Sequence, residues 1–290
     1  MNSAPLRKVL NGIGNMTTTF NLEFPKLSTE KVYLYYADIS ALDRIDAQTS
    51  EKWLDHSERT RLERFYFERD NKLYKLSHCM LRWVLSNYTG QRPEQHQFDI
   101  NNYGKPSLKG NTDISFNLSH SNGTAVIALG KNQQLGVDLE QINYQKEIHN
   151  ILDNYFHPNE IFQFKALNNT QKNALFFKLW TLKEAYIKAS GMGLSIPLNA
   201  FNFDCTKAPN LDVFFTSTLN EKTSHWQFSL FESEQYDNFL TAVAVQSNYV
   251  KIEAYNVMLD KNRVSPHKLS SILQTKNANQ HANLKSLVNE

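Results

Sequence analysis

The chain has 290 residues, of which 41% are hydrophobic and 12% aromatic, enough to bury a substantial core in one or two domains. Its 31 basic and 29 acidic residues give a formal net charge of +2, which provides no broad field for nucleic acid or an anionic membrane. Two cysteines, Cys79 and Cys205, argue against a disulfide framework or a zinc site and predict a reducing cytoplasmic location. The sequence contains no run of about 18 consecutive apolar residues, so it predicts no membrane-spanning helix.

The first elements expected along the chain are a strand followed by helices. Residues 1–25 have the character of a flexible leader, and residues 31–37 predict the first strand. Between residues 50 and 88, apolar residues recur at steps of three and four, which predicts helices. The same region is rich in basic residues, for which a solvated face is the ordinary explanation and phosphate binding the alternative. These residues are Arg59, Arg61, Arg64, Arg69, Lys72, Lys75 and Arg82.

The order of elements then repeats. Strand patterns fill residues 114–139, and helical patterns follow at 147–167 and 173–189. Further strands are expected at 226–230 and 240–245. This repetition predicts an α+β fold of two similar halves, residues 26–135 and 136–258. The polar composition of residues 259–290 predicts a C-terminal tail with one short amphipathic stretch.

The segment GVDLEQI, residues 136–142, places two carboxylates on one face of a strand. Side chains two apart in a strand share a face, so Val137 and Leu139 can enter a core while Asp138 and Glu140 emerge together on the other side. The pair is either a solvated outer face or half of a cation site. Taken alone, the pair favours the solvated face.

The helical segment at residues 176–194 supplies a third carboxylate. Glu184 and Lys188 lie one turn apart, and by themselves they predict an ordinary helix ion pair worth about 0.3–0.5 kcal/mol. Glu184 can instead complete a site with Asp138 and Glu140. Magnesium prefers hard oxygen ligands and commonly binds substrate phosphates, so three carboxylates from two elements suit it.

Four blocks now occur together in one order: NYGKPSL (102–108), FNLSHSNG (116–123), GVDLEQI (136–142) and WTLKEAYIKASGMGL (180–194). In this combination the sequence resembles the Sfp-type 4′-phosphopantetheinyl transferases, in the subgroup marked by Trp and Lys-Glu-Ala. The similarity covers the chain from about residue 30 to residue 250. Leu73 and His78 depart from the pattern, because many members carry arginine in this helix. The departure leaves open which basic side chains meet the coenzyme phosphates.

The resemblance implies a pseudo-two-fold fold with the active site between its halves. It also implies transfer of the 4′-phosphopantetheine arm of coenzyme A to a serine of an acyl or peptidyl carrier protein, with release of adenosine 3′,5′-bisphosphate. The carriers served would belong to polyketide, non-ribosomal peptide or polyunsaturated fatty acid synthesis. The expected partners are the carrier and coenzyme A, with no nucleic acid or membrane, and the expected state is a monomer. The alternatives are an inactive coenzyme A-binding regulatory module and a magnesium-dependent pyrophosphohydrolase.

The resemblance also implies roles for individual residues. Asp138, Glu140 and Glu184 are the implied Mg²⁺ ligands, with Glu184 taking the serine proton and Lys188 neutralising the leaving phosphate. Without the resemblance, a lysine in a Gly-Lys-Pro turn and polar residues beside a strand would be ordinary surface features. With it, the implied coenzyme contacts are Lys105, Ser119, His120, Arg59, Arg64, Lys75 and Lys183, with Ser119 and His120 on the 3′-phosphate.

Overall fold

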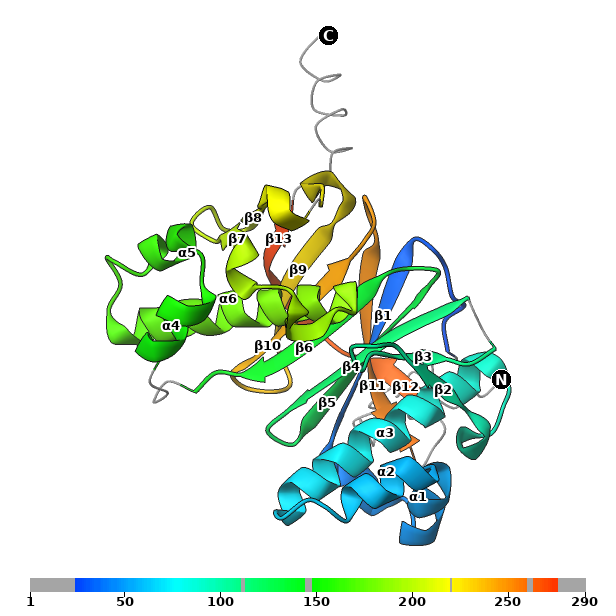
Figure 1. Cartoon of the computed structure of the whole chain (residues 1–290). Coiled ribbons are helices and arrows are strands. Elements are labelled where there is room, and N and C mark those ends of the chain that lie inside the picture. Colours follow the sequence, from blue (N-terminus) through cyan, green and yellow to red (C-terminus); the bar gives the residue numbers. More distant parts are fainter. Residues whose placement is uncertain (1–23, 111–112, 144–147, 220, 260–262, 276–290) are drawn as a thin grey trace, which may run out of the picture.

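The computed structural model describes residues 24–275 except 111–112, 144–147, 220 and 260–262. Its strands form a five-stranded sheet, a six-stranded sheet and a short hairpin. A long helix packs on each large sheet, and the two sheets pack on each other through a third apolar cluster. Figure 1 shows the two long helices, α3 and α6, each beside its own sheet. The layers therefore follow the order helix, sheet, sheet, helix.

The first sheet has the strand order β12-β11-β1-β5-β4. Its strands are β1 (Lys31–Asp38), β4 (Ile114–Ser121), β5 (Thr124–Lys131), β11 (Lys251–Met258) and β12 (Arg263–Pro266). The same half contains helices α1 (Ala47–Trp53), α2 (His56–Leu62) and α3 (Glu68–Thr89), and the hairpin of β2 (Phe98–Ile100) and β3 (Pro106–Leu108). In β1, Tyr33 and Tyr35 face the α3 cluster, whereas Leu34 and Tyr36 face the second sheet or lie beside it. The strand is thus apolar on both faces because both faces are covered.

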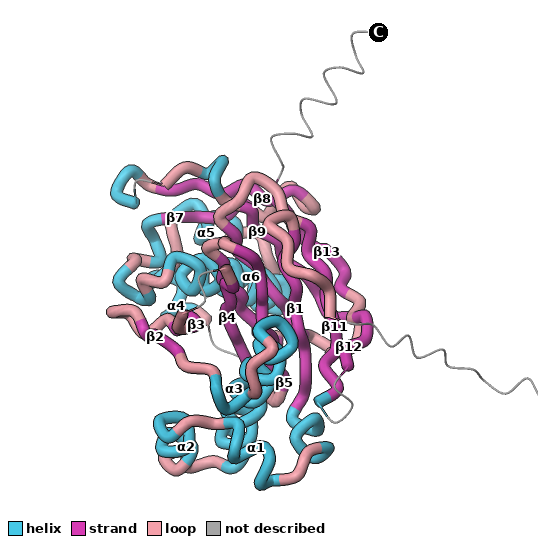
Figure 2. Tube along the Cα trace, turned by 90° about the vertical axis from the view of Figure 1, so that its right-hand side faces the viewer, coloured by secondary structure: helices cyan, strands magenta, loops and turns pink. Residues whose placement is uncertain are grey.

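The second sheet has the order β6-β10-β9-β13-β8-β7. Its strands are β6 (Leu135–Gln141), β7 (Phe201–Asp204), β8 (Asn210–Phe215), β9 (Gln227–Ser233), β10 (Phe239–Val245) and β13 (Leu269–Thr275). Its helices are α4 (His149–Tyr155), α5 (Pro158–Gln163) and α6 (Asn169–Ser190). Figure 2 shows α4, α5 and α6 above α1 and α2, which lie at the bottom of that view.

The two long helices confirm the prediction of two similar α+β halves. Both α3 and α6 have 22 residues, and each ends at a glycine in the left-handed region, Gly90 at φ 70° and Gly191 at φ 69°. Glycine takes this conformation without the penalty that a Cβ imposes, so both helices stop sharply. None of the helices in the described part of the chain combines the length and apolarity needed to cross a membrane.

The predicted C-terminal boundary is wrong in two respects. Strand β11 lies within residues 136–258, the range predicted for the second half, but it pairs in parallel with β1 in the first sheet. Residues 263–275 were expected to belong to a polar tail, but they form β12 and β13. These strands bury few side chains, chiefly Val264 and Leu273, so their composition carries little apolar periodicity. The rest of the predicted tail (276–290) and most of the predicted leader (1–23) lie outside the described residues.

Candidate functional site

Strands β4 and β6, edge strands of the two sheets, lie side by side. Polar side chains at alternate positions of β4 accept hydrogen bonds from alternate backbone N–H groups of β6. The acceptors are Asn117 Oδ1, Ser119 Oγ and Ser121 Oγ, and the donors are Val137, Leu139 and Gln141, at 2.9, 3.1 and 3.3 Å respectively. These bonds satisfy the edge of β6, which would otherwise expose unsatisfied donors. The Asn-x-Ser-x-Ser spacing of β4 therefore fixes β6 at the junction between the sheets.

A glycine lets α6 cross β6 at close range. A Cβ at Gly136 would lie 2.2 Å from the carbonyl oxygen of Ala185 and 2.3 Å from the backbone nitrogen of Ala189. Both atoms belong to the backbone of α6, so no side-chain movement could relieve the clash. Gly136 thus allows the face of β6 that carries Asp138 to lie directly against α6.

Asp138 is the centre of a polar cluster on this face. The prediction that Val137 and Leu139 enter a core is confirmed, because both pack between the sheets. The carboxylate of Asp138 is only 4% exposed, so its face of β6 is not a solvated surface. Its Oδ1 accepts hydrogen bonds from Lys188 Nζ at 2.6 Å and from Ser119 Oγ at 3.0 Å. Lys188 Nζ also donates to Ser119 Oγ at 2.8 Å, which closes a triangle.

Glu184 lies one turn before Lys188 on α6, and the charges of Asp138 and Lys188 act on its carboxyl group. Burial and the negative charge of Asp138 raise the pKa of Glu184, and the charge of Lys188 opposes them more weakly. A carboxylate with a raised pKa is a stronger base near neutral pH. Glu140, two residues after Asp138, is partly exposed and accepts from Ser121 Oγ at 3.4 Å. The three carboxylates therefore come from two elements, as the sequence predicts.

The donor set fits a magnesium ion, although it is not preassembled. Across the described residues, no three His, Cys, Asp or Glu side chains converge as a ready metal cluster. Asp138 Oδ2, however, is buried and has no hydrogen-bond partner among the same residues. A buried carboxylate oxygen left unsatisfied is costly, and a cation would relieve that cost. Hard oxygens from Asp138, Glu140 and Glu184 match the ligand preference of magnesium.

A cavity of about 940 Å³ opens in the first half of the molecule. It lies among α2, α3, the β2–β3 hairpin and β4, and its wall combines apolar rings with several basic side chains. The basic lining residues are His56, Arg61, Arg64 and His78. Asn117 and Leu118 of β4 also line the cavity, so it borders the strand that supplies Ser119 to the Asp138 cluster. Its size and mixed lining suit a large anionic ligand.

His120 follows Ser119 on β4, so its side chain points to the opposite face of the strand, the same face as Leu118, which lines the cavity. Its surroundings and the positive charges of Lys188 and His78 lower the pKa of His120. Of the other predicted coenzyme contacts, Arg64 lines the cavity.

The remaining predicted coenzyme contacts are held elsewhere by protein groups. Lys183 is fully buried, with its Nζ 2.8 Å from Glu160, so the prediction that it contacts coenzyme is wrong and its role is structural. The Nζ of Lys105 donates to the carbonyls of Leu135 at 3.0 Å and Ala189 at 2.9 Å, and burial lowers its pKa to about 8. Lys105 therefore ties its turn to the end of α6.

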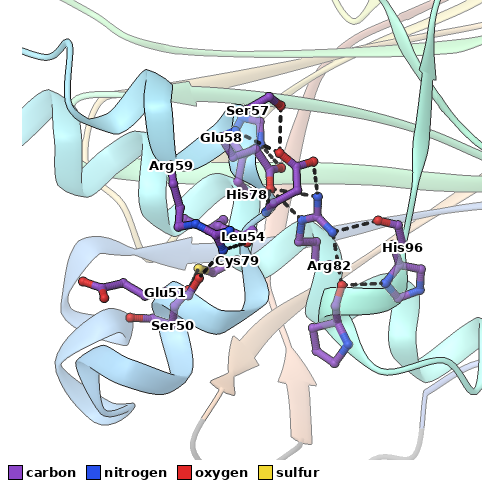
Figure 3. Close-up of polar contacts among 12 residues, drawn as sticks. Ser50, Glu51, Leu54, Ser57, Glu58, Arg59, His78, Cys79, Arg82 and His96 are labelled. Carbon is purple, nitrogen blue, oxygen red and sulfur yellow. Dashed lines mark hydrogen bonds and ion pairs between the residues drawn. The ribbon is translucent and has the colours of Figure 1, made fainter.

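Two basic residues of the helical region are likewise engaged at the start of that region. Arg59 donates to the backbone carbonyls of Leu54 and Glu51, and Lys75 lies 3.9 Å from the carboxylate of Glu51 (Figure 3 shows Arg59, Leu54 and Glu51).

The hydroxyl of Ser119 hydrogen-bonds to Asp138, Lys188 and the backbone of β6. Its assignment to the 3′-phosphate is therefore replaced by a role in positioning the carboxylate cluster.

Three residues that build the site were not predicted from the sequence. Gly136 allows the close approach of α6 to β6. Asn117 accepts a hydrogen bond from the backbone of β6 and so joins β4 to that strand. Glu58, which lies at the cavity wall, belongs to a buried network with Arg82. A signal existed for Glu58, because Asp55-x-x-Glu58 has the spacing of a capping box, which the structure contains.

Comparisons with known proteins agree with this arrangement. Residues 134–244 match the model of the 4′-phosphopantetheinyl transferase superfamily, and residues 45–132 match the model described as 4′-phosphopantetheinyl transferase, N-terminal. Over 196 residues the chain is 33% identical to the 4′-phosphopantetheinyl transferase HetI of Nostoc, which covers 66% of this chain and 78% of that protein. Over 173 residues it is 30% identical to the transferase Sfp of Bacillus subtilis, covering 59% and 75% respectively.

The chain therefore belongs to the Sfp-type 4′-phosphopantetheinyl transferase family, as its sequence motifs predict. Its two sheet-containing halves correspond to the two matched regions. It is a 4′-phosphopantetheinyl transferase that activates carrier proteins. Its placement in the subgroup marked by Trp180 and Lys183-Glu184-Ala185 stays a prediction.

Proposed function

We propose that this transferase modifies a serine of an acyl or peptidyl carrier in polyketide, non-ribosomal peptide or polyunsaturated fatty acid synthesis, with Mg²⁺ bound by Asp138, Glu140 and Glu184. The observation that carries the proposal is the hydrogen-bonded cluster of Asp138, Ser119 and Lys188, with Glu184 one turn away. A large cavity with Arg61 and Arg64 in its wall borders the strand that supplies Ser119. In this proposal the enzyme acts as a monomer. Its location is the reducing cytoplasm, which the two free cysteines, Cys79 and Cys205, support.

The chemistry assigned to these residues is a phosphoryl-type transfer. The serine hydroxyl of the carrier attacks the phosphorus on the pantetheine side of the pyrophosphate. The bond from that phosphorus to the bridging oxygen breaks, and adenosine 3′,5′-bisphosphate leaves with the bonding electron pair. Magnesium, when bound, would neutralise charge that develops on the pyrophosphate oxygens.

The side chains supply the remaining functions. Glu184, whose pKa is raised by burial and by Asp138, accepts the proton of the serine hydroxyl. Lys188 is held by Asp138 and Ser119, and its ammonium stabilises the departing phosphate. The cavity holds the adenosine portion of coenzyme A, and Arg64 in its wall contributes positive charge to the binding. His120, on the strand that borders the cavity, supplies a hydrogen-bonding side chain.

The test is incubation with coenzyme A, magnesium and a panel of apo carriers, followed by intact-protein mass spectrometry. Gain of one phosphopantetheine arm by a carrier of the proposed classes supports the proposal and identifies the pathway. A parallel incubation without carrier measures release of adenosine 3′,5′-bisphosphate. Release at the same rate without carrier would indicate a pyrophosphohydrolase, and no transfer to any such carrier would overturn the proposed substrate class.

A further inference from the structure

His78 projects from α3 into the cavity wall and is fixed from two sides. Its Nδ1 lies 2.7 Å from Glu58 Oε1, and its ring stacks on Tyr74 with centroids 4.0 Å apart. The side chain is 22% exposed, and the residue lines the cavity. Because Nδ1–H donates to the carboxylate, Nε2 faces any ligand in the cavity, and it donates a hydrogen bond there in the imidazolium form, which an adjacent anion favours.

The carboxylate that holds His78 is itself immobilised. Glu58 Oε2 accepts from Arg82 Nε and from the backbone N–H of Asp55, both at 2.8 Å. Figure 3 shows Arg82 beside Glu58 and His78. Arg82 is fully buried, and its guanidinium also pairs with Asp55 at 2.8 Å. Networks of buried charged hydrogen bonds of this kind hold their members in one geometry. Glu58 is thus a positioning residue for the imidazole of His78.

The charges that face His78 come from every element around it. Glu58 and Asp55 come from the start of α2, and both contact Arg82 of α3. Arg61 of α2 lies over the ring of Tyr74, 5.4 Å from its centroid. On β4, Leu118 lines the same cavity as His78, and the next residue, Ser119, bonds Lys188. Strand β4 therefore links the cavity that His78 lines to the carboxylate cluster.

The positions of the cavity and the cluster along β4 indicate which ligand group each one meets. The pyrophosphate must reach Lys188 and the carboxylates, because in the proposed reaction the bond that breaks lies there. The adenosine portion then extends along β4 into the cavity, and its remaining anionic group is the 3′-phosphate on the ribose. We propose that His78, held by Glu58, donates a hydrogen bond from Nε2 to this 3′-phosphate and sets the preference for coenzyme A over dephospho-coenzyme A. This inference rests on the proposed function.

The experiment compares the dissociation constants of coenzyme A and dephospho-coenzyme A by titration calorimetry for the wild type, His78→Gln and His78→Arg. His78→Gln is expected to weaken coenzyme A binding by about tenfold, the scale of one charge-assisted hydrogen bond, and to change dephospho-coenzyme A binding less than about twofold. His78→Arg keeps a cation at the same position, so it is expected to retain the preference for coenzyme A. The matched control is His225→Gln, which alters an exposed histidine in the other half and should change neither constant.

Equal losses on both ligands, or unchanged preference in His78→Gln, would overturn the inference while leaving the proposed function intact. Failure of the wild type to bind coenzyme A or to modify a carrier would count against the proposed function itself, and with it the inference. Circular dichroism melts of all variants report whether the fold is kept. If His78→Gln does not fold, loss of the preference for coenzyme A in a folded His78→Arg would still refute the proposed contact.

Discussion

Substituting Gly136 by alanine should separate the two elements of the active site. The new Cβ would lie 2.2 Å from Ala185 O and 2.3 Å from Ala189 N, whereas ordinary contacts begin near 3.4 Å. The backbone of β6 or α6 must therefore move by about 1 Å to restore van der Waals separation. Overpacking of this kind costs about 1–3 kcal/mol of stability. The same shift would break the bond of 2.6 Å between Lys188 and Asp138, and misplacement by about 1 Å can reduce a rate about 100-fold.

The assay is kcat for carrier modification, measured together with the melting temperature. Gly130→Ala is the matched control, because the three atoms nearest to its new Cβ belong to the side chains of Gln133 and Leu135 and not to the backbone of α6. The control is expected to lose some stability and keep kcat, whereas Gly136→Ala is expected to lose kcat by about 100-fold even below its melting temperature. A folded Gly136→Ala enzyme with wild-type kcat would refute the claim that close approach of β6 and α6 builds the site.

Three further perturbations test other parts of the account. Glu184→Gln keeps the shape of the side chain but loses its basicity, so kcat should fall about 10²–10⁴-fold, while the coenzyme A affinity measured by calorimetry should stay almost unchanged. Near-normal turnover would show that Glu184 is only an ion-pair partner within the helix. Ser119→Ala should lower kcat without altering the ratio of coenzyme A to dephospho-coenzyme A affinity, and a selective loss for coenzyme A would restore Ser119 to the 3′-phosphate. His267 is 6% exposed, and burial lowers its pKa from 6.5 to about 4. Below pH 6.5 the unfolded chain takes up a proton that the folded protein does not, so the free energy of unfolding should fall by up to about 3 kcal/mol between pH 6.5 and pH 4. Chemical denaturation across this range should show a smaller decrease for His267→Gln, and an equal slope in both proteins would contradict the burial argument.

The strand and helix periods explain why much of the site was predictable. Alternation in β6 places Asp138 and Glu140 on one face whatever the fold, and the i, i+4 spacing of α6 places Glu184 near Lys188. What these periods do not specify is which element covers each face. The face of Asp138 lies against α6 rather than solvent because Gly136 permits close packing, and this is a tertiary contact.

The same limit explains the residues whose roles were mistaken. Lys183 adjoins Glu184 in sequence, but neighbouring helix residues point about 100° apart, and Lys183 enters the core to meet Glu160. A lysine in a helix is ordinarily exposed, so only the tertiary structure reveals its buried partner. β12 has four residues and buries only Val264, so its sequence carries little strand periodicity, although it pairs with the preceding strand β11. β13 pairs with β8 and β9, which are distant in sequence, so its pairing is a tertiary property.

The central claim is that carboxylates at the junction of β6 and α6 perform the transfer together with magnesium. The most direct measurement is the initial rate of carrier modification as a function of magnesium concentration, for the wild type and Asp138→Asn, after both are stripped with chelator. The wild type should be inactive in excess chelator and recover as magnesium is restored, while Asp138→Asn, which keeps the shape of the side chain and loses its charge, should stay inactive across the same titration. A full wild-type rate in excess chelator, or a wild-type rate in Asp138→Asn, would contradict the account.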